Sequence, residues 1–416
     1  MAVSRFLYLC YFGLREPLVQ TQVLPYLREL AGKGGLKPTL LTFEPDYRKA
    51  WTQEALAHQR AQLEADGIRW LSLPYHKRPS LPATAYDIIA GAWKAARLVR
   101  QDGIEVLHAR AHIPLAMALL AQRLSACRLV FDIRGLMAEE YADAGVWRET
   151  SLPFRLIKWL ERKGLKRADQ IVVLTERMRV WLVEQGLALA ERIEVIPCCV
   201  DFQRFAEASD EKSASTTNRF EIVYAGSVTG LYMLEEMGRF FLALRSEEPR
   251  AFLRILTKSS AEDAGVLLKR VGLDESDFRV GAVPASAVPL FLRGARLGIS
   301  FRKPTFSQIA ASPTKIPEYL AAGLPVVSNA GIGDTDELLE SEAVGVIVRD
   351  LNAQGYAAAA LQALALTREP GMRARCERVA CERFDLVKIG GARYRKIYQR
   401  ISEQVAAVKR AVNVHQ

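Results

Sequence analysis

The chain has 416 residues, of which 50% are hydrophobic and 25% are charged, and its formal net charge is +10. This length exceeds a single hydrophobic core, so we expect two domains of about 200 residues each. No apolar run reaches the roughly 20 residues that a membrane-spanning helix needs. The short apolar segment 1–12 lacks a cleavage site, so it is predicted to be a first strand and not a signal peptide.

The cysteines indicate the expected cellular compartment, and the net charge limits the classes of binding partner. The six cysteines include no Cys-x-x-Cys pair, which favours free thiols in a reducing cytoplasm over a disulfide framework or a zinc site. The positive charge suits nucleic acid, an anionic membrane surface or phosphorylated substrates. No nucleic-acid-binding motif accompanies it, so we expect no nucleic acid partner and favour a membrane surface and a diphosphate. The expected location is the cytoplasm, with peripheral association at the inner membrane face.

The first half of the chain alternates apolar runs with segments of helical periodicity, which predicts parallel strands joined by helices. The expected strands cover 6–12, 38–43, 68–73, 105–110, 128–132, 169–175 and 193–196. A helix is expected around Val23 to Leu30. Ligands bind at the carboxyl ends of parallel strands, so polar residues at these ends are candidates for a site.

His108, Arg110 and His112 gather near the carboxyl end of the strand that begins at Glu105. Ile113 directly precedes a proline and is therefore expected to be extended, which would hold His112 on an open loop. Two histidines and an arginine at one strand end indicate an active site, although a single histidine is more often structural.

The next strand ends in Asp132-Ile-Arg-Gly135, followed by the carboxylate pair Glu139 and Glu140. Charges at the end of an apolar strand must be paired or face a cleft, because an isolated buried charge is costly. Two interpretations remain open. Asp132 and Arg134 are a structural pair that braces the loop, or they bind the acceptor and act in acid–base chemistry.

Residues 152–166 are predicted to form a basic amphipathic helix, in which Trp159 lies among lysines and arginines. Such a helix suits the interface of an anionic lipid membrane. The alternative is a helix that packs on the sheet and leaves a solvated basic face.

The second half begins after a polar segment, 206–218, which we interpret as a linker. The apolar run from Phe220 then leads into a loop with Gly226, Ser227 and Gly230, where glycines allow a ligand to approach the backbone closely. Further strands are predicted to end near Lys258, Val283 and Arg302. A cation at such a strand end suits a diphosphate.

The stretch Ser312-Pro-Thr-Lys-Ile-Pro-Glu-Tyr-Leu-Ala-Ala-Gly-Leu-Pro-Val-Val327 predicts a loop, a short helix, a turn and a buried strand. Ser312 and Thr314 are candidate N-caps, with Thr314 preferred, and Gly323 is the expected left-handed stop. A helix start favours a phosphate, and Lys315 in its first turn would contact that anion. Glu318, one turn further on, can accept hydrogen bonds from ribose hydroxyls. The alternative is a surface helix with ordinary charges.

This stretch resembles the donor-binding motif in the C-terminal domain of GT-B glycosyltransferases of family 4 (group 1). The hinge-like segment 193–205 and the two-domain pattern extend the resemblance over most of the chain. The run from Asp132 to Gly135 is similar to a subgroup that makes bacterial surface polysaccharides.

The resemblance implies two Rossmann-like α/β domains that face a cleft. The acceptor-side domain would cover 1–205, with a C-terminal helix, 390–416, that packs back onto it, and the donor domain would cover 219–389. It implies a retaining transfer of sugar from a nucleotide-diphosphate sugar to a glycan or lipid-linked acceptor. Because the sequence shows no cluster of metal ligands, we expect the reaction to need no metal ion, and no bound cofactor is expected.

The donor would be held by residues that match the family motif or lie at the neighbouring strand ends. These are Gly226, Ser227, Lys258, Val283, Arg302, Ser312, Thr314, Lys315 and Glu318. The candidates for catalysis are Asp132, Arg134, His112 and Lys315.

The chain departs from the family pattern at three places. Ala310 stands where the family has the first glutamate of a Glu-x7-Glu pair, Leu231-Tyr-Met replaces a Lys-Gly pair, and Asp132 and Arg134 lie where many members have a histidine. Rival interpretations are therefore a nucleotide-sugar epimerase or hydrolase and a non-catalytic nucleotide-sugar-binding subunit. The sugar, the base and the acceptor are not specified by these residues.

Overall fold

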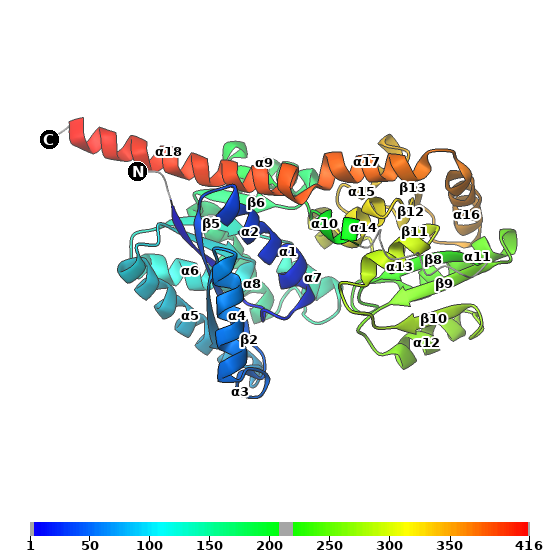
Figure 1. The fold of residues 1–416 in the computed structure, drawn as a ribbon, viewed down its shortest axis with the longest axis horizontal. Helices are drawn as coiled ribbons and strands as arrows, with labels where there is room; N and C mark the ends of the chain where they lie inside the picture. The colour runs from blue at the N-terminus through cyan, green and yellow to red at the C-terminus, as the bar shows by residue number, and fades with distance from the viewer. Residues whose placement is uncertain (1–3, 208–218, 415–416) are drawn as a thin grey trace. The chain divides into compact units, whose positions relative to one another are not determined.

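A computed structural model describes residues 4–207 and 219–414. They form two compact α/β units (Figure 1). The first unit contains the residues up to Ala142, then 147–197 and the segment after Leu386, and the second contains 143–146 and 198–386. The segment 198–205 thus lies in the second unit, although the sequence places it in the first domain. Most of the expected linker, 208–218, lies outside the described residues.

The first unit is built on a seven-stranded parallel sheet with the order β3-β2-β1-β4-β5-β6-β7. In the register of the central strand β1, Leu7 pairs with Thr39 on one side and Leu107 on the other. The strands are β1 (Arg5–Cys10), β2 (Lys37–Glu44), β3 (Arg69–Pro74), β4 (Val106–Arg110), β5 (Arg128–Asp132), β6 (Gln170–Val173) and β7 (Ile193–Val195).

The helices of the first unit cover both faces of this sheet. Because parallel crossovers are right-handed, the connections toward β3 and those toward β7 place their helices on opposite faces. The helices are α1 (Pro17–Gln22), α2 (Leu24–Gly32), α3 (Tyr47–Ala50), α4 (Gln53–Ala65), α5 (Ser80–Asp102), α6 (His112–Leu124), α7 (Met137–Asp143), α8 (Leu152–Arg167), α9 (Glu176–Glu184), the short η1 (Ala190–Arg192) and the C-terminal α18 (Ala392–Val414). Hence α5, α6, α8 and α9 share one face.

The second unit has a six-stranded parallel sheet with the order β10-β9-β8-β11-β12-β13. Its strands are β8 (Phe220–Ala225), β9 (Ala251–Leu256), β10 (Phe278–Gly281), β11 (Leu297–Ser300), β12 (Val326–Asn329) and β13 (Gly345–Val348). Its helices are α10 (Gln203–Glu207), α11 (Leu234–Glu247), α12 (Ala261–Arg270), α13 (Val288–Gly294), η2 (Phe306–Ala310), α14 (Lys315–Ala321), α15 (Thr335–Ser341), α16 (Ala353–Arg368) and α17 (Met372–Phe384). A π-helical turn, η3 (Leu386–Gly391), precedes α18.

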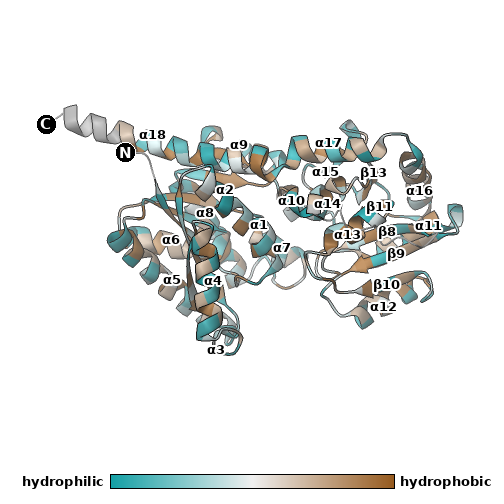
Figure 2. Cartoon of the chain, in the orientation of Figure 1, coloured by the Kyte–Doolittle hydropathy of each residue, from teal (hydrophilic) through white to brown (hydrophobic). Residues whose placement is uncertain are grey.

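The two sheets are buried on both faces, as expected for strands that helices cover. All residues of β4 and of β12 are buried. The helices are amphipathic, and in Figure 2 most of them carry both polar and apolar stretches along their length. Side-chain caps start several of them; Thr175, for example, accepts a hydrogen bond from the N–H of Met178.

The last helix, α18, is part of the first unit. Its residues Tyr394, Ile397, Tyr398 and Ile401 are each at most 2% exposed. Arg395 pairs with Glu29 of α2, and Arg400 pairs with Glu194 of β7 at 2.9 Å. Side chains from residue 408 onward, including the basic end of this helix, lie outside the described ones.

The predicted strands are all present, with ends that shift by a few residues. The sequence reasoning missed β13, which is only four residues long. The helix expected around Val23 to Leu30 is present as α2, and a break at Val23 (φ −125°, ψ −63°) separates it from the preceding short helix α1.

Candidate functional site

Lys315, the first residue of α14, lies in a cage of aromatic rings in the second unit. Its side chain is 3% exposed, and its Nζ lies 4.1 Å from the ring centroid of Tyr232 and 5.0 Å from that of Tyr224. Burial lowers the pKa of the ammonium group, and Arg302 lowers it further, while Tyr232 and Glu318 act in the opposite direction. An anion that binds beside this buried ammonium group would stabilise its charged form.

Gly226, directly after β8, makes room for this lysine. Its φ of +146° is a conformation that side chains rarely allow, and a Cβ added here would lie 3.1 Å from Cε and 3.2 Å from Nζ of Lys315. Tyr319 of α14 fixes the geometry, since its hydroxyl donates to the carbonyl of Ile299 (3.2 Å) and accepts from the N–H of Ala225 (2.9 Å).

Arg302 adds a second cation next to the ring of Tyr232. The centre of its guanidinium lies 4.9 Å from the ring centroid of Tyr232, and its Nη1 donates to the Tyr232 hydroxyl at 3.3 Å. Its Nε donates to the side-chain oxygen of Gln308 at 2.7 Å. Asn329, at the end of β12, holds the Arg302 backbone through two hydrogen bonds of 2.8 Å. Lys315, Tyr232 and Arg302 therefore form a rigid cationic edge.

Glu318 faces a different partner. Arg204 of α10 approaches its carboxylate at 3.4 Å and donates to the carbonyl of Ala285 at 3.1 Å. Burial raises the pKa of Glu318, and Arg204 and Lys315 oppose this rise. Arg204 thus connects Glu318 with the loop that follows β10.

The other predicted donor residues take up varied positions in the second unit. Ser312 accepts a hydrogen bond from the N–H of Cys198 at 3.1 Å and is not a cap. Thr314 occupies the N-cap position, but its side chain makes no capping hydrogen bond. Ser227 and Lys258 are exposed at the ends of β8 and β9. The expected stop at Gly323 is confirmed by its φ of +77°.

Val283 lies beside a cavity of about 300 Å³ between β9, β10 and α13. Arg254, Arg279 and Phe291 also line this cavity. The guanidinium of Arg254 lies 5.3 Å from the centroid of Phe291 and is held by Glu221. The cavity is adjacent to the loop that Arg204 contacts.

Ala310 ends η2 and is fully buried. The position of the family's first glutamate is therefore filled by a methyl group. Gln308, two residues earlier, is also fully buried, and its side-chain oxygen accepts a hydrogen bond from Arg302. The contact with Arg302 in this segment is therefore made by an amide and not by a carboxylate.

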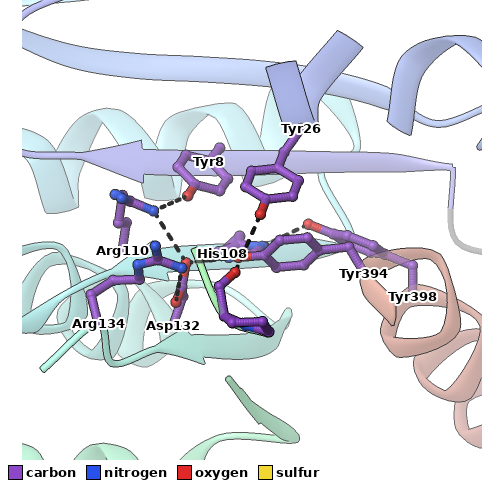
Figure 3. A network of polar contacts seen from close by, with 9 residues as sticks. Tyr8, Tyr26, His108, Arg110, Asp132, Arg134, Tyr394 and Tyr398 are labelled. Carbon is purple, nitrogen blue, oxygen red and sulfur yellow. Dashed lines mark hydrogen bonds and ion pairs between the residues drawn. The ribbon is translucent and has the colours of Figure 1, made fainter. Parts of the chain in front are cut away.

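Asp132 and Arg134 are brought together in the first unit, within a buried network (Figure 3). Asp132 is fully buried; its Oδ2 accepts from the Tyr394 hydroxyl at 3.0 Å and lies 3.5 Å from Arg110 Nη1, and its Oδ1 lies 3.6 Å from Arg134 Nη1. Burial raises the pKa of Asp132, but Arg134, His108 and Arg110 together lower it to about 2.

His108 extends this network to α18. Its Nδ1 lies 2.8 Å from the Tyr398 hydroxyl, and its Nε2 lies 3.7 Å from Asp132. Burial lowers the pKa of His108. Arg134 has a φ of +54°, an uncommon value for a residue with a side chain, which shows how tightly the turn is held. The arrangement supports the structural interpretation of the Asp132–Arg134 pair.

The expectation of an open loop at His112 is wrong. His112 is the fully buried first residue of α6, because Ala111 adopts a positive φ of +65° and lets the helix begin two residues before Pro114. A proline is tolerated in a first helical turn, where its missing N–H is not needed. His112 Nε2 lies 3.0 Å from Glu161 of α8, whose carboxylate also binds Lys158. His112 therefore joins α6 to α8, separately from Asp132.

Tyr232, Arg204, Asn329 and Gln308 were not predicted. Tyr232 stands where the family has a Lys-Gly pair, so the departure itself was the available signal. Arg204 lies in the hinge-like segment 193–205, whose resemblance to the family does not mark this position. Within residues 4–207 and 219–414, no group of three or more His, Cys, Asp or Glu is arranged to hold a metal ion. In the same part of the chain, no helix combines the length and the apolar character needed to cross a membrane.

Comparisons with known proteins bear on this fold. Residues 21–204 match the model of Glycosyltransferase Family 4. A comparison with curated protein sequences finds no match. A crystal structure of a glycosyltransferase from Rickettsia africae is 14% identical, with a TM-score of 0.67 over 95% of this chain and 98% of that chain.

Two further solved structures are similar. Sucrose-phosphate synthase from Thermosynechococcus elongatus is 15% identical, with a TM-score of 0.69 over 99% of this chain and 100% of that chain. HepE from Anabaena, in complex with UDP and glucose, is 16% identical, with a TM-score of 0.64 over 97% of this chain and 99% of that chain. At such identities the likeness establishes the fold.

The family match and the fold confirm the resemblance inferred from the sequence. Residues 21–204 match a glycosyltransferase family 4 domain, and the chain has the GT-B fold of the glycosyltransferases that it resembles.

Proposed function

We propose that the chain transfers a sugar from a nucleotide-diphosphate sugar to a glycan or lipid-linked acceptor, with retention of configuration and without a metal ion, in the synthesis of a cell-surface polysaccharide. The observation that carries the proposal is the caged ammonium of Lys315, held against Gly226 and beside Arg302. HepE, which has the same fold, is seen with UDP and glucose.

In this proposal the cationic edge binds the diphosphate of the donor. Fixed charges that stabilise a leaving diphosphate lower the barrier most when they need no reorganisation, and the contacts of Arg302 and Lys315 provide this rigidity. Glu318 accepts hydrogen bonds from the ribose, and the loop at Ala285 lies beside the base. The acceptor binds at the carboxyl edge of the first sheet, near Arg134 and Glu139, with the protein at the inner face of the cytoplasmic membrane.

A second candidate, nucleotide-sugar binding without transfer, is favoured by one observation. The buried methyl group of Ala310 occupies the position of a family glutamate, so that carboxylate is missing from the grip on the donor sugar. Turnover separates the two candidates, because the binding protein would retain a nucleotide preference and release no product.

The test is thermal unfolding with UDP, GDP, CMP, ADP and dTDP. A nucleotide at about 100 times its dissociation constant adds about 2.7 kcal/mol to the free energy of unfolding. We expect one nucleotide to stabilise the wild type, Glu318→Ala to lose the shift, and Glu337→Ala, which removes an exposed carboxylate of α15, to keep it. If no nucleotide stabilises the folded wild type, or if Glu318→Ala keeps the full shift, the donor site is refuted.

A further inference from the structure

The outer surface of α5 carries large apolar side chains where solvent-facing residues would normally be polar. Tyr86, Ile89 and Trp93 follow each other at helical spacing and are 61%, 64% and 61% exposed. The same face continues with Arg97 and Arg100, which are exposed. In Arg97 the centre of the guanidinium lies 5.7 Å from the ring centroid of Trp93.

The outer surface of α8 repeats this pattern. Leu152, Leu156 and Trp159 are 73%, 55% and 54% exposed and recur at helical spacing. The face then continues with Lys163, whose Nζ lies 5.6 Å from the ring centroid of Trp159, and with Arg167. Each helix therefore presents an exposed tryptophan with a cation one turn after it.

The two helices lie in one layer. They cover the same face of the first sheet, α6 lies between them, and α5 and α8 both pack on α6 (Figure 1). All three run from the carboxyl edge of the sheet to its amino edge, as crossover helices do. The exposed apolar residues of α5 and α8 thus lie toward the carboxyl edge, and eight of the ten cations of the three helices lie in the halves toward the amino edge.

A cavity of about 320 Å³ opens between α6 and α8 in the same layer. Its apolar walls include Leu119, Leu120 and Trp159. Three cations, Arg123, Lys163 and Arg167, also line it. Apolar walls with adjoining cations suit a molecule that has both an alkyl part and an anionic group.

Basic residues far outnumber acidic residues in this layer of helices. The segments α5, α6 and α8 contain ten lysines and arginines but three acidic residues. Of the three, Asp87 and Glu161 are each 1% exposed, and Asp102 pairs with Arg69 at 2.6 Å. The exposed face is therefore strongly cationic as well as apolar, which is the combination that binds anionic lipid surfaces.

We propose that the α5–α6–α8 face docks on an anionic lipid bilayer, with Trp93 and Trp159 at the headgroup level and the basic residues on lipid phosphates. Tryptophan prefers this interface because its ring is apolar and its N–H is polar. The inference deepens the proposed function: the apolar half of the face adjoins the carboxyl edge where Arg134 lies, so a lipid-linked acceptor in the same bilayer reaches that edge over a short path.

The test uses the full chain and sedimentation with vesicles of phosphatidylcholine, either alone or with about a third phosphatidylglycerol. We expect the wild type to bind the anionic vesicles, with weaker binding at high salt, and the tryptophan emission to shift to the blue. Trp93→Ser with Trp159→Ser should abolish binding. Val266→Ser with Leu361→Ser, which removes two side chains exposed to 52% and 54% on the second unit, should leave it unchanged.

A second pair of variants tests how much the positive charge of this face contributes to vesicle binding. Arg97→Gln with Lys163→Gln should weaken vesicle binding about fivefold for each cation removed. Arg270→Gln with Arg349→Gln makes the same change in net charge on the second unit and should have no effect. Equal binding by the wild type to both vesicle types, or equal loss in the variants of either unit, overturns the proposal. The nucleotide-induced stability shift of the same proteins shows separately whether the donor site fails.

Discussion

Replacing Asp132 by asparagine tests whether the network of Figure 3 is structural. Asp132 is fully buried, and its carboxylate lies 3.5 Å and 3.6 Å from the guanidinium groups of Arg110 and Arg134. The substitution leaves these buried cations without their carboxylate. Removing one partner of a buried ion pair costs about 3–5 kcal/mol, so we expect a loss of that size in urea unfolding at pH 7.

The control for this variant is Asp66→Asn. Asp66 pairs with Arg28 at 2.7 Å, a shorter distance than in the network, but the two side chains are 35% and 48% exposed. An exposed pair contributes about 0–1 kcal/mol. If Asp132→Asn lowers the free energy of unfolding no more than Asp66→Asn does, the buried network does not stabilise the fold. Intact stability with loss of sugar transfer would favour the catalytic interpretation of Asp132 instead.

The pH dependence gives a second check with a defined sign. The pKa of Asp132 is lowered from 3.8 to about 2 in the folded state. Its stabilising contribution is therefore complete above pH 3.8 and is lost as the pH falls through 2, and the shift corresponds to about 2 kcal/mol. The stability difference between the wild type and Asp132→Asn should be constant above about pH 5 and shrink toward pH 2.

Two further substitutions test other contacts. Gly226→Ala places a methyl group 3.2 Å from Nζ of Lys315 at a φ of +146°. We expect the unfolding free energy to fall by about 1–3 kcal/mol and the nucleotide-induced stability shift to be lost. Unchanged nucleotide binding would contradict the close approach of the nucleotide to Gly226 and Lys315. Tyr398→Phe removes the hydroxyl 2.8 Å from His108; urea unfolding should show a loss of about 1–3 kcal/mol, and a neutral result would mean that α18 is held by apolar packing alone.

The sequence predicts the sheets well because buried parallel strands are continuous apolar runs, whereas β13 escapes notice at four residues. It also predicts Lys315 and Gly226 as neighbours of one ligand, since both lie in short motifs with known backbone geometry. It does not predict the cage, because Tyr232 lies 83 positions from Lys315 and only the fold joins them. Similarly, no local pattern shows that Tyr394, 262 positions after Asp132, closes the network.

His112 illustrates a different limit. The rule that a residue before proline is extended favoured a loop, but the positive φ of Ala111 starts a helix there, and Glu161 holds the imidazole. A local preference of the backbone was overridden by a buried contact between two helices.

The place of α18 in the first unit has a consequence for synthesis on the ribosome. Tyr394 and Tyr398 complete the buried network around Asp132, yet they are translated only after the whole of the second unit. Although the N-terminal parts of proteins generally fold first during synthesis, this unit must wait with its charged centre incomplete until the second unit has already emerged. An early stop codon just before α18 therefore damages the first unit, whose sheet was translated long before that helix.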